Sequence, residues 1–177
     1  MPIEKDRFRR IRKRTMVDVL SPIGFDVSST TIAKSDDGNV MQIIEFQFGS
    51  FAPSYTINIG HHFRALPSVG AVHPERTAVF DSACDYMLNG RFARLISDRD
   101  LWFDYGETKQ DAEAQLRHQL GIYIGGPEQF RRAYPSPAQT MALFSPDQLA
   151  ATEVIPSVVA GFQFSARNLA YMLAAHA

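Results

Sequence analysis

The chain has 177 residues, 45% of them hydrophobic and 21% charged, and a formal net charge of −1. That composition excludes a disordered chain, and the length predicts one domain over residues 1–177 because chains divide into domains mainly above about 250 residues. A single cysteine, Cys84, excludes an intramolecular disulfide, and no apolar run approaches the roughly 18 residues of a membrane-spanning helix, so we expect a cytoplasmic protein without membrane contact.

The charges are unevenly divided between the N-terminal segment and the rest. Residues 1–14, the expected start of a basic helix, contain seven lysines and arginines against two acidic residues, whereas the remainder contains eleven against seventeen. Such a segment can bind nucleic acid or another acidic surface, or it can be a solvated helix that pairs with an acidic body. We favour the solvated helix and do not expect nucleic acid as a partner.

Hydrophobic periodicity predicts a helix over residues 5–20, where apolar side chains recur at helical spacing on one side. That stripe consists of Phe8, Ile11, Met16, Val19 and Leu20. Pro22 and Gly24 should then end the helix, since proline lacks a backbone donor and glycine permits a left-handed turn.

Three strands are expected next, over residues 25–34, 40–48 and 55–61. β-Branched residues fill the first, and apolar and polar side chains alternate along the other two. Turn sequences at residues 36–39 and 49–53 separate them. Short turns between alternating strands predict an antiparallel meander with one packed face.

The remainder predicts helices and short strands. Residues 75–88 fit a helix or a strand, residues 95–96 and 101–105 resemble strands, and a helix is expected over residues 108–120. The expected fold is α+β: an antiparallel β-sheet meander with an N-terminal helix and several C-terminal helices packed on one face. We expect residues 138–177 to form a helical C-terminal part, and we expect further helices at residues 128–133, 146–152 and 166–175.

No familiar catalytic or metal-binding motif occurs in the sequence. His61 and His62 are adjacent on a predicted strand, so their side chains point to opposite faces and cannot chelate one ion together. Cys84 could act as a nucleophile beside His61, His62 or His73, but a cysteine among apolar residues is more often part of the core. We therefore expect no catalytic residue, metal or cofactor, and the question of an enzymatic activity stays open.

An acidic and aromatic cluster is the most unusual local feature. Its carboxylates could perform acid–base chemistry or hold a divalent cation, they could be a solvated strand edge that leads into a helix, or they could form a docking surface for a basic partner. The members of the cluster are Asp98, Asp100, Trp102, Phe103, Asp104, Tyr105, Glu107, Asp111 and Glu113.

Short motifs follow one another along the chain. They are Leu20-x-Pro22-x-Gly24-Phe25, Gln42-Ile43-Ile44-x-Phe46-Gln47, Tyr55-x-Ile57-Asn58-Ile59-Gly60, Cys84, Arg91-Phe92-x-Arg94-Leu95 and Asp100-x-Trp102-Phe103. In this order and spacing, residues 16–135 resemble a bacterial family known as domain of unknown function 4304. Phe103 stands where a second tryptophan is common in that family, and extra residues separate Cys84 from Arg91. The resemblance implies an α+β domain with an antiparallel sheet and a strand at Cys84, and it implies no activity.

From these features we expect a non-enzymatic protein-binding module of bacterial type, in the form of an immunity protein that neutralises a basic toxin, as a monomer or a homodimer. The expected contact residues are Trp102, Asp98, Asp100, Asp104 and Glu107. The alternative is an uncharacterised enzyme or small-ligand-binding protein with a site on the sheet face. That site would be lined by Asn58, His61, Gln47 and Glu45.

Overall fold

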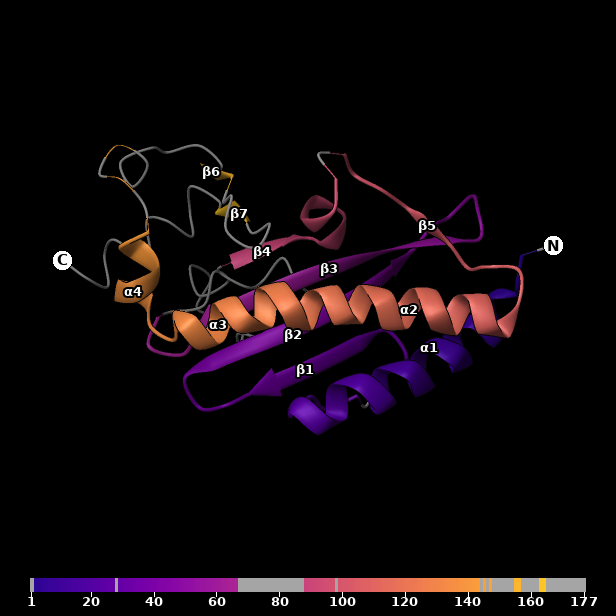
Figure 1. Cartoon of the computed structure of the whole chain (residues 1–177), viewed down its shortest axis with the longest axis horizontal. Coiled ribbons are helices and arrows are strands. Elements are labelled where there is room, and N and C mark those ends of the chain that lie inside the picture. The colour runs from indigo at the N-terminus through magenta and orange to yellow at the C-terminus, as the bar shows by residue number, and fades with distance from the viewer. Residues whose placement is uncertain are drawn as a thin grey trace, which may run out of the picture.

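The computed structural model of the chain describes residues 2–27, 29–66, 88–97, 99–143, 145, 147, 155–156 and 163–164 (Figure 1). The helices are α1 (Lys5–Leu20), α2 (Lys109–Tyr123), α3 (Gln129–Ala133) and α4 (Pro137–Met141). The strands are β1 (Ile32–Asp36), β2 (Val40–Phe48), β3 (Ser54–Phe63), β4 (Leu88–Arg91), β5 (Phe103–Asp104), β6 (Ile155–Pro156) and β7 (Gln163–Phe164). Among the described helices, none has both the length and the apolar character needed to cross a bilayer.

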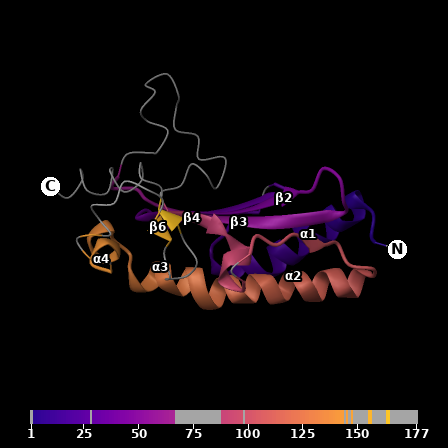
Figure 2. The same ribbon diagram turned by 90° about the horizontal axis from the view of Figure 1, so that it is seen from above.

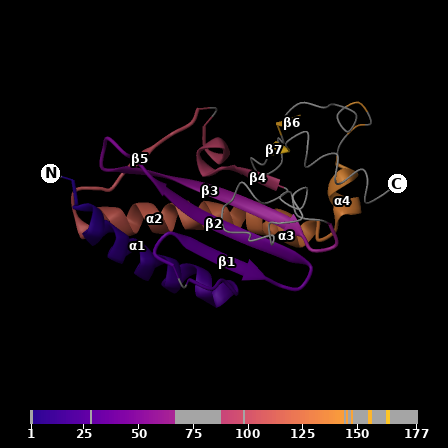
Figure 3. The ribbon, with the colours of Figure 1, turned by 180° about the vertical axis from the view of Figure 1, so that it is seen from behind.

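The described strands form one antiparallel sheet in the order β1-β2-β3-β4-β7-β6, and β5 pairs with the beginning of β3. Helices α1 and α2 pack against each other and lie on the same face of this sheet (Figure 2). Seen from behind, β1, β2 and β3 stand in front of the two helices (Figure 3). The predicted α+β fold, with an N-terminal helix, an antiparallel sheet and helices on one face, is confirmed.

Helix α1 has the predicted bounds and buries the predicted stripe against the sheet. Phe8 is the centre of its contact, because its ring stacks on Tyr105 at 4.5 Å and lies 4.9 Å from Tyr55. A 3-10 turn over Ser21–Ile23 then leads to Gly24, whose φ of 94° is a left-handed conformation that favours glycine. The local sequence therefore determines where α1 ends, as predicted.

Helix α2 begins at a capping box, in which the Thr108 hydroxyl accepts from the backbone N–H of Asp111 and the Asp111 carboxylate accepts from that of Thr108. Its inner side is held to the sheet by a hydrogen bond of 2.7 Å from the Tyr55 hydroxyl to Gln119. An ion pair between Arg117 and Asp18 joins α2 to α1. The two helices thus form one layer over the sheet.

Some local predictions were wrong. Residues 25–34 are not a continuous strand: the chain reverses at residues 29–31, and Asp26 pairs with Lys34 of β1. In this reversal the Ser29 hydroxyl accepts from the backbone N–H of Thr31. Residues 95–96 are not strand either, since a 3-10 helix covers Phe92–Leu95.

The chain stays helical after α2. A π-helix covers Ile124–Glu128, a segment that contains two glycines and Pro127, and α3 follows directly. Helix α4 starts at Pro137, which is a favourable first helical residue after the Ser136 cap.

The C-terminal part was expected to be helical, but β6 and β7 are strands within residues 138–177. Of the element expected at residues 75–88, only Leu88 is described, and it begins β4. The element expected at 166–175, and all but Asp147 of that at 146–152, lie outside the described residues.

We predict that Thr108→Ala lowers the free energy of unfolding by about 1 kcal/mol, because it removes the hydroxyl that accepts from Asp111 in the first turn of α2. Urea unfolding followed by circular dichroism measures the change. Gln110→Ala is the matched control, since Gln110 is exposed in the same turn. Equal losses in the two variants would contradict the capping role.

Candidate functional site

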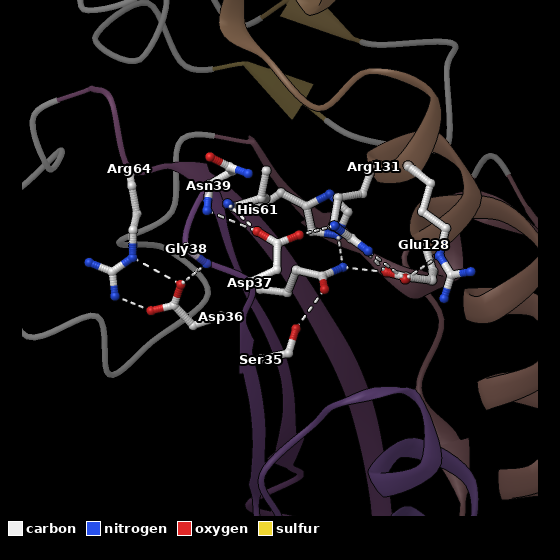
Figure 4. A network of polar contacts seen from close by, with 12 residues as sticks. Ser35, Asp36, Asp37, Gly38, Asn39, His61, Arg64, Glu128 and Arg131 are labelled. Carbon is white, nitrogen blue, oxygen red and sulfur yellow. Dashed lines mark hydrogen bonds and ion pairs between the residues drawn. The ribbon is translucent and has the colours of Figure 1, made fainter.

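A polar network lies beneath the helix layer, where the end of α2 meets the sheet (Figure 4). Gln42 and His61 occupy directly opposite positions on β2 and β3. Tyr123 is the last residue of α2, and Glu128 is the last residue of the π-helix. All four side chains are buried, so each polar atom needs a partner within the protein.

The hydrogen bonds form a chain through Gln42. Ser35 donates to Gln42 Oε1 at 2.6 Å, and Gln42 Nε2 donates to Glu128 at 2.7 Å and to the Tyr123 hydroxyl at 3.1 Å. Gln42 Nε2 and the Tyr123 hydroxyl also lie 3.2 Å and 3.3 Å from His61 Nε2. The direction of these two contacts depends on which ring nitrogen of His61 carries the proton.

Two arginines of α3 complete the network around Glu128. Arg131 donates twice to its carboxylate, with both bonds at 3.0 Å, and Arg132 donates once at 2.8 Å. Arg131 also forms an ion pair with Asp37 in the turn before β2. The π-helix ends at Glu128, directly before the α3 arginines that bind it, and it contains Gly125 and Gly126, which tolerate its wider turn. Turns of π-helix are frequent at functional sites.

The charges of the network are settled at neutral pH. Burial alone would raise the pKa of Glu128, but hydrogen bonds from Arg131, Gln42 and Arg132 outweigh burial and hold that pKa at about 2. Burial lowers the pKa of His61 to about 3 and raises the pKa of Tyr123 well above its usual value. Glu128 is therefore ionised, and both of its carboxylate oxygens accept hydrogen bonds. The network links the sheet to the helices and stabilises their contact.

The four residues predicted to line a site on the sheet face are divided between its two faces. Glu45, Gln47 and Asn58 lie on the face away from α1 and α2, where Glu45 is opposite Asn58 and the Asn58 amide donates to Gln47 at 3.4 Å. His61 is an odd number of residues from Asn58, so strand alternation turns it to the other face and into the network. The structure thus brings three of the four together.

The acidic and aromatic cluster presents Trp102 at the surface. Along residues 102–105, side chains alternate: Trp102 and Asp104 are exposed, whereas Phe103 and Tyr105 pack inward. Trp102 keeps 42% of its surface exposed, and the guanidinium of Arg91 lies 5.7 Å from the centre of its ring. Arg91 is held there by a hydrogen bond of 3.1 Å to Asp100. Asp98 lies outside the described residues.

The carboxylates of this cluster have different roles. Asp111 caps α2, Glu113 forms an ion pair with Lys109, and Asp100 binds Arg91. Asp104 and Glu107 are exposed and have no hydrogen-bond or ion-pair partner in the described part of the chain. Within that part, no three His, Cys, Asp or Glu side chains are grouped so that they could hold a metal ion. Cys84 and His73 lie beyond it.

The sequence did not reveal Arg12 of α1 as a buried residue. Its side chain has 0% exposure, and its guanidinium lies 5.0 Å from the Phe46 ring and 4.6 Å from the Phe48 ring. None of its three nitrogens has a hydrogen-bond acceptor in the described structure. Burial, and next the charge of Arg9, lower the pKa of Arg12 to about 9. Its place on the i, i+4 row with Phe8 and Met16 was the available signal.

Cation–π contacts compensate for the burial of Arg12. A desolvated cation–π contact contributes about 2 kcal/mol, and Arg12 contacts two rings, Phe46 and Phe48. A buried charge without a partner costs about 3–5 kcal/mol. The two rings together therefore offset a cost of similar size.

The model of the family described as Domain of unknown function (DUF4304) matches residues 16–124, which is more than half of the chain. The chain belongs to the DUF4304 family. The predicted resemblance is confirmed, and no curated protein or solved structure matches the chain. The DUF4304 match contains Gln42, His61 and Trp102, and it leaves out Arg12 and Glu128. The DUF4304 description names no activity.

We predict that Glu128→Gln destabilises the protein at neutral pH by on the order of 3 kcal/mol, because it leaves Arg131 and Arg132 without a carboxylate. The pKa of Glu128 falls from 4.5 to about 2 on folding, so its contribution is complete above pH 4.5 and is lost as the pH falls toward 2. The difference in the free energy of unfolding between the wild-type protein and the variant should become smaller between pH 4.5 and pH 2.

Urea unfolding at a series of pH values measures this difference. Asp100→Asn is the control, because Asp100 is an exposed carboxylate whose ion pair with Arg91 contributes little. A Glu128→Gln difference that stays constant from pH 7 to pH 2 would show that the ionised carboxylate is not the stabilising group.

Proposed function

We propose that this chain is a protein-binding module whose partner is a basic protein. The surface that binds it, called here the tryptophan surface, consists of Arg91, Ile96, Asp100, Trp102, Asp104 and Glu107. The observation that carries the proposal is an exposed tryptophan held in place by an arginine, which is itself held by a carboxylate.

The apolar part of the tryptophan surface supports this proposal. Trp102 and Ile96 are exposed by 42% and 46% and are available for contact with a partner. Tryptophan and arginine are enriched among the residues that dominate binding energy at protein interfaces. The contact between Arg91 and Trp102 restrains both side chains before binding, so less conformational entropy is lost when a partner orders them.

The charged part of the surface indicates the kind of partner. Asp104 and Glu107 carry charges that nothing in the described structure neutralises, and unpaired carboxylates steer association with a positive surface. A toxin with a basic active-site cleft is a partner of this chemistry. By analogy with other small bacterial families, we propose that the chain is an immunity protein that neutralises such a toxin.

We predict that Trp102→Ala weakens binding to the partner by roughly 30-fold, or about 2 kcal/mol, because it removes the central apolar contact. The partner is first captured from an extract of the native host with the wild-type chain, identified and purified. Its affinity for each variant is then measured by isothermal titration calorimetry. A double charge reversal, Asp104→Lys with Glu107→Lys, should lower the association rate constant with the partner. It should also make that rate constant less sensitive to salt concentration.

Matched controls separate a local effect from a general one. Val17→Ala removes apolar surface that is 41% exposed on α1, and Asp26→Lys reverses an exposed charge near β1. Both should bind like the wild-type chain. The proposal is wrong if the captured protein binds Trp102→Ala and the double charge reversal with unchanged affinity.

A further inference from the structure

Three cations of α1 converge on one aromatic ring. Lys5, Arg9 and Arg12 are spaced at i, i+4 and i+7, which places them on one stripe of the helix. The Lys5 ammonium and the Arg9 guanidinium each lie 5.2 Å from the centre of the Phe48 ring, and the Arg12 guanidinium lies 4.6 Å from it. These residues, called here the Phe48 cation cluster, run from exposed Lys5 through half-exposed Arg9 to buried Arg12.

The Phe48 cation cluster carries more positive than negative charge. Asp6 is the one carboxylate bonded to it in the described structure, at 3.2 Å from Arg9. Arg9 Nε and all three nitrogens of Arg12 are buried with no acceptor among the described residues. Three cations with one bonded carboxylate produce a positive potential at the adjacent surface, and that potential favours a bound anion.

A groove of about 430 Å³ begins beside this cluster. It lies between residues 2–5 and the loop of residues 49–53, with Tyr105 also in its lining. Lys5 belongs to both the groove and the cluster, and Gly49 of the groove directly follows Phe48. The positive end of α1 is at the same place, which favours a bound anion.

We propose that the chain binds a phosphate monoester that carries an aromatic or other apolar group. Its phosphate is held by exposed Lys5 and half-exposed Arg9, and its apolar group lies in the groove. The charge of buried Arg12 adds to the attraction without touching the ligand. A phosphate supplies up to two negative charges and several acceptor oxygens, which suits a cluster of three cations, and arginine pairs with two phosphate oxygens at once.

The groove offers an apolar lining for the rest of the molecule. Ile3, Pro53 and Phe51 contribute to it, and Phe51 is fully exposed at the loop. Glu4 is the one acidic side chain of the lining, so the phosphate is favoured at the cluster rather than inside the groove. A volume of about 430 Å³ is in the range of small-molecule sites.

The opposite side of α1 provides matched controls. Arg10 and Arg14 are exposed there and have the same charge as Arg9. A polyanion that binds the basic helix as a whole would depend on Arg10 and Arg14 as much as on Arg9. A small phosphate monoester held at the Phe48 cation cluster would not.

The test uses phenyl phosphate and inorganic phosphate as probes, with isothermal titration calorimetry and thermal unfolding at an ionic strength kept constant with sodium chloride. Phenyl phosphate should bind more tightly than inorganic phosphate. Arg9→Gln and Lys5→Gln should each weaken its binding on the order of tenfold, because each removes a charged hydrogen bond. Arg10→Gln and Arg14→Gln should leave binding unchanged.

Arg12→Met tests the buried member directly. It should reduce the stabilisation by phenyl phosphate, because the positive potential at the surface falls, while the variant without ligand melts near the wild-type temperature because the buried charge and its ring contacts are lost together. If this variant does not fold, the comparison of Lys5 and Arg9 with Arg10 and Arg14 decides. The proposal is overturned if phenyl phosphate stabilises the chain no more than sodium chloride does, if it binds no better than inorganic phosphate, or if the control variants weaken it equally.

Discussion

Polar groups that α1 and α2 bury against the sheet must find their partners without water. The Tyr55 hydroxyl meets this requirement by donating to Gln119 of α2, and Gln42 meets it by bonding Ser35, Tyr123 and Glu128. The same requirement makes the position of α2 on the sheet specific, because a shifted helix would leave these groups unpaired.

The helix layer satisfies this requirement in one place and not in another. Just after α2, Glu128 accepts the hydrogen bonds of two arginines. In the middle of α1, Arg12 has aromatic rings for neighbours and no acceptor in the described structure. One turn before Arg12, the ring of Phe8 packs on Tyr55 and Tyr105. The molecule thus combines an aromatic centre with one polar site whose groups are paired and one buried cation whose donors have no acceptor among the described residues.

The sequence was sufficient to predict those helices and strands whose bounds depend on neighbouring residues. The bounds of α1 and β2 follow from side-chain periodicity, and Asp111 caps α2 as acidic residues in a first helical turn commonly do. Residues 25–34 were misjudged because β-branched composition does not show that a chain reverses. The partners of His61 could not be foreseen, since Tyr123 is 62 residues away along the chain.

The candidate sites were predictable to different degrees for the same reason. Trp102, Asp100 and Asp104 stand close together in sequence, and the exposure of all three agrees with a surface position. Arg12 was visible as one member of an apolar row, but the absence of an acceptor depends on what β2 places opposite it. Periodicity predicts which face of a helix is buried, and it does not predict what that face meets.

The π-helix Ile124–Glu128 sets the direction in which every later side chain of this helical stretch points. Each residue turns an α-helix by about 100°, so shortening this segment by one residue would rotate α3 relative to α2 by that angle. Arg131 would then point away from Asp37, although no amino acid of the network had been replaced. The number of residues here matters as much as their identity, so a single-codon deletion is a more severe change than most substitutions.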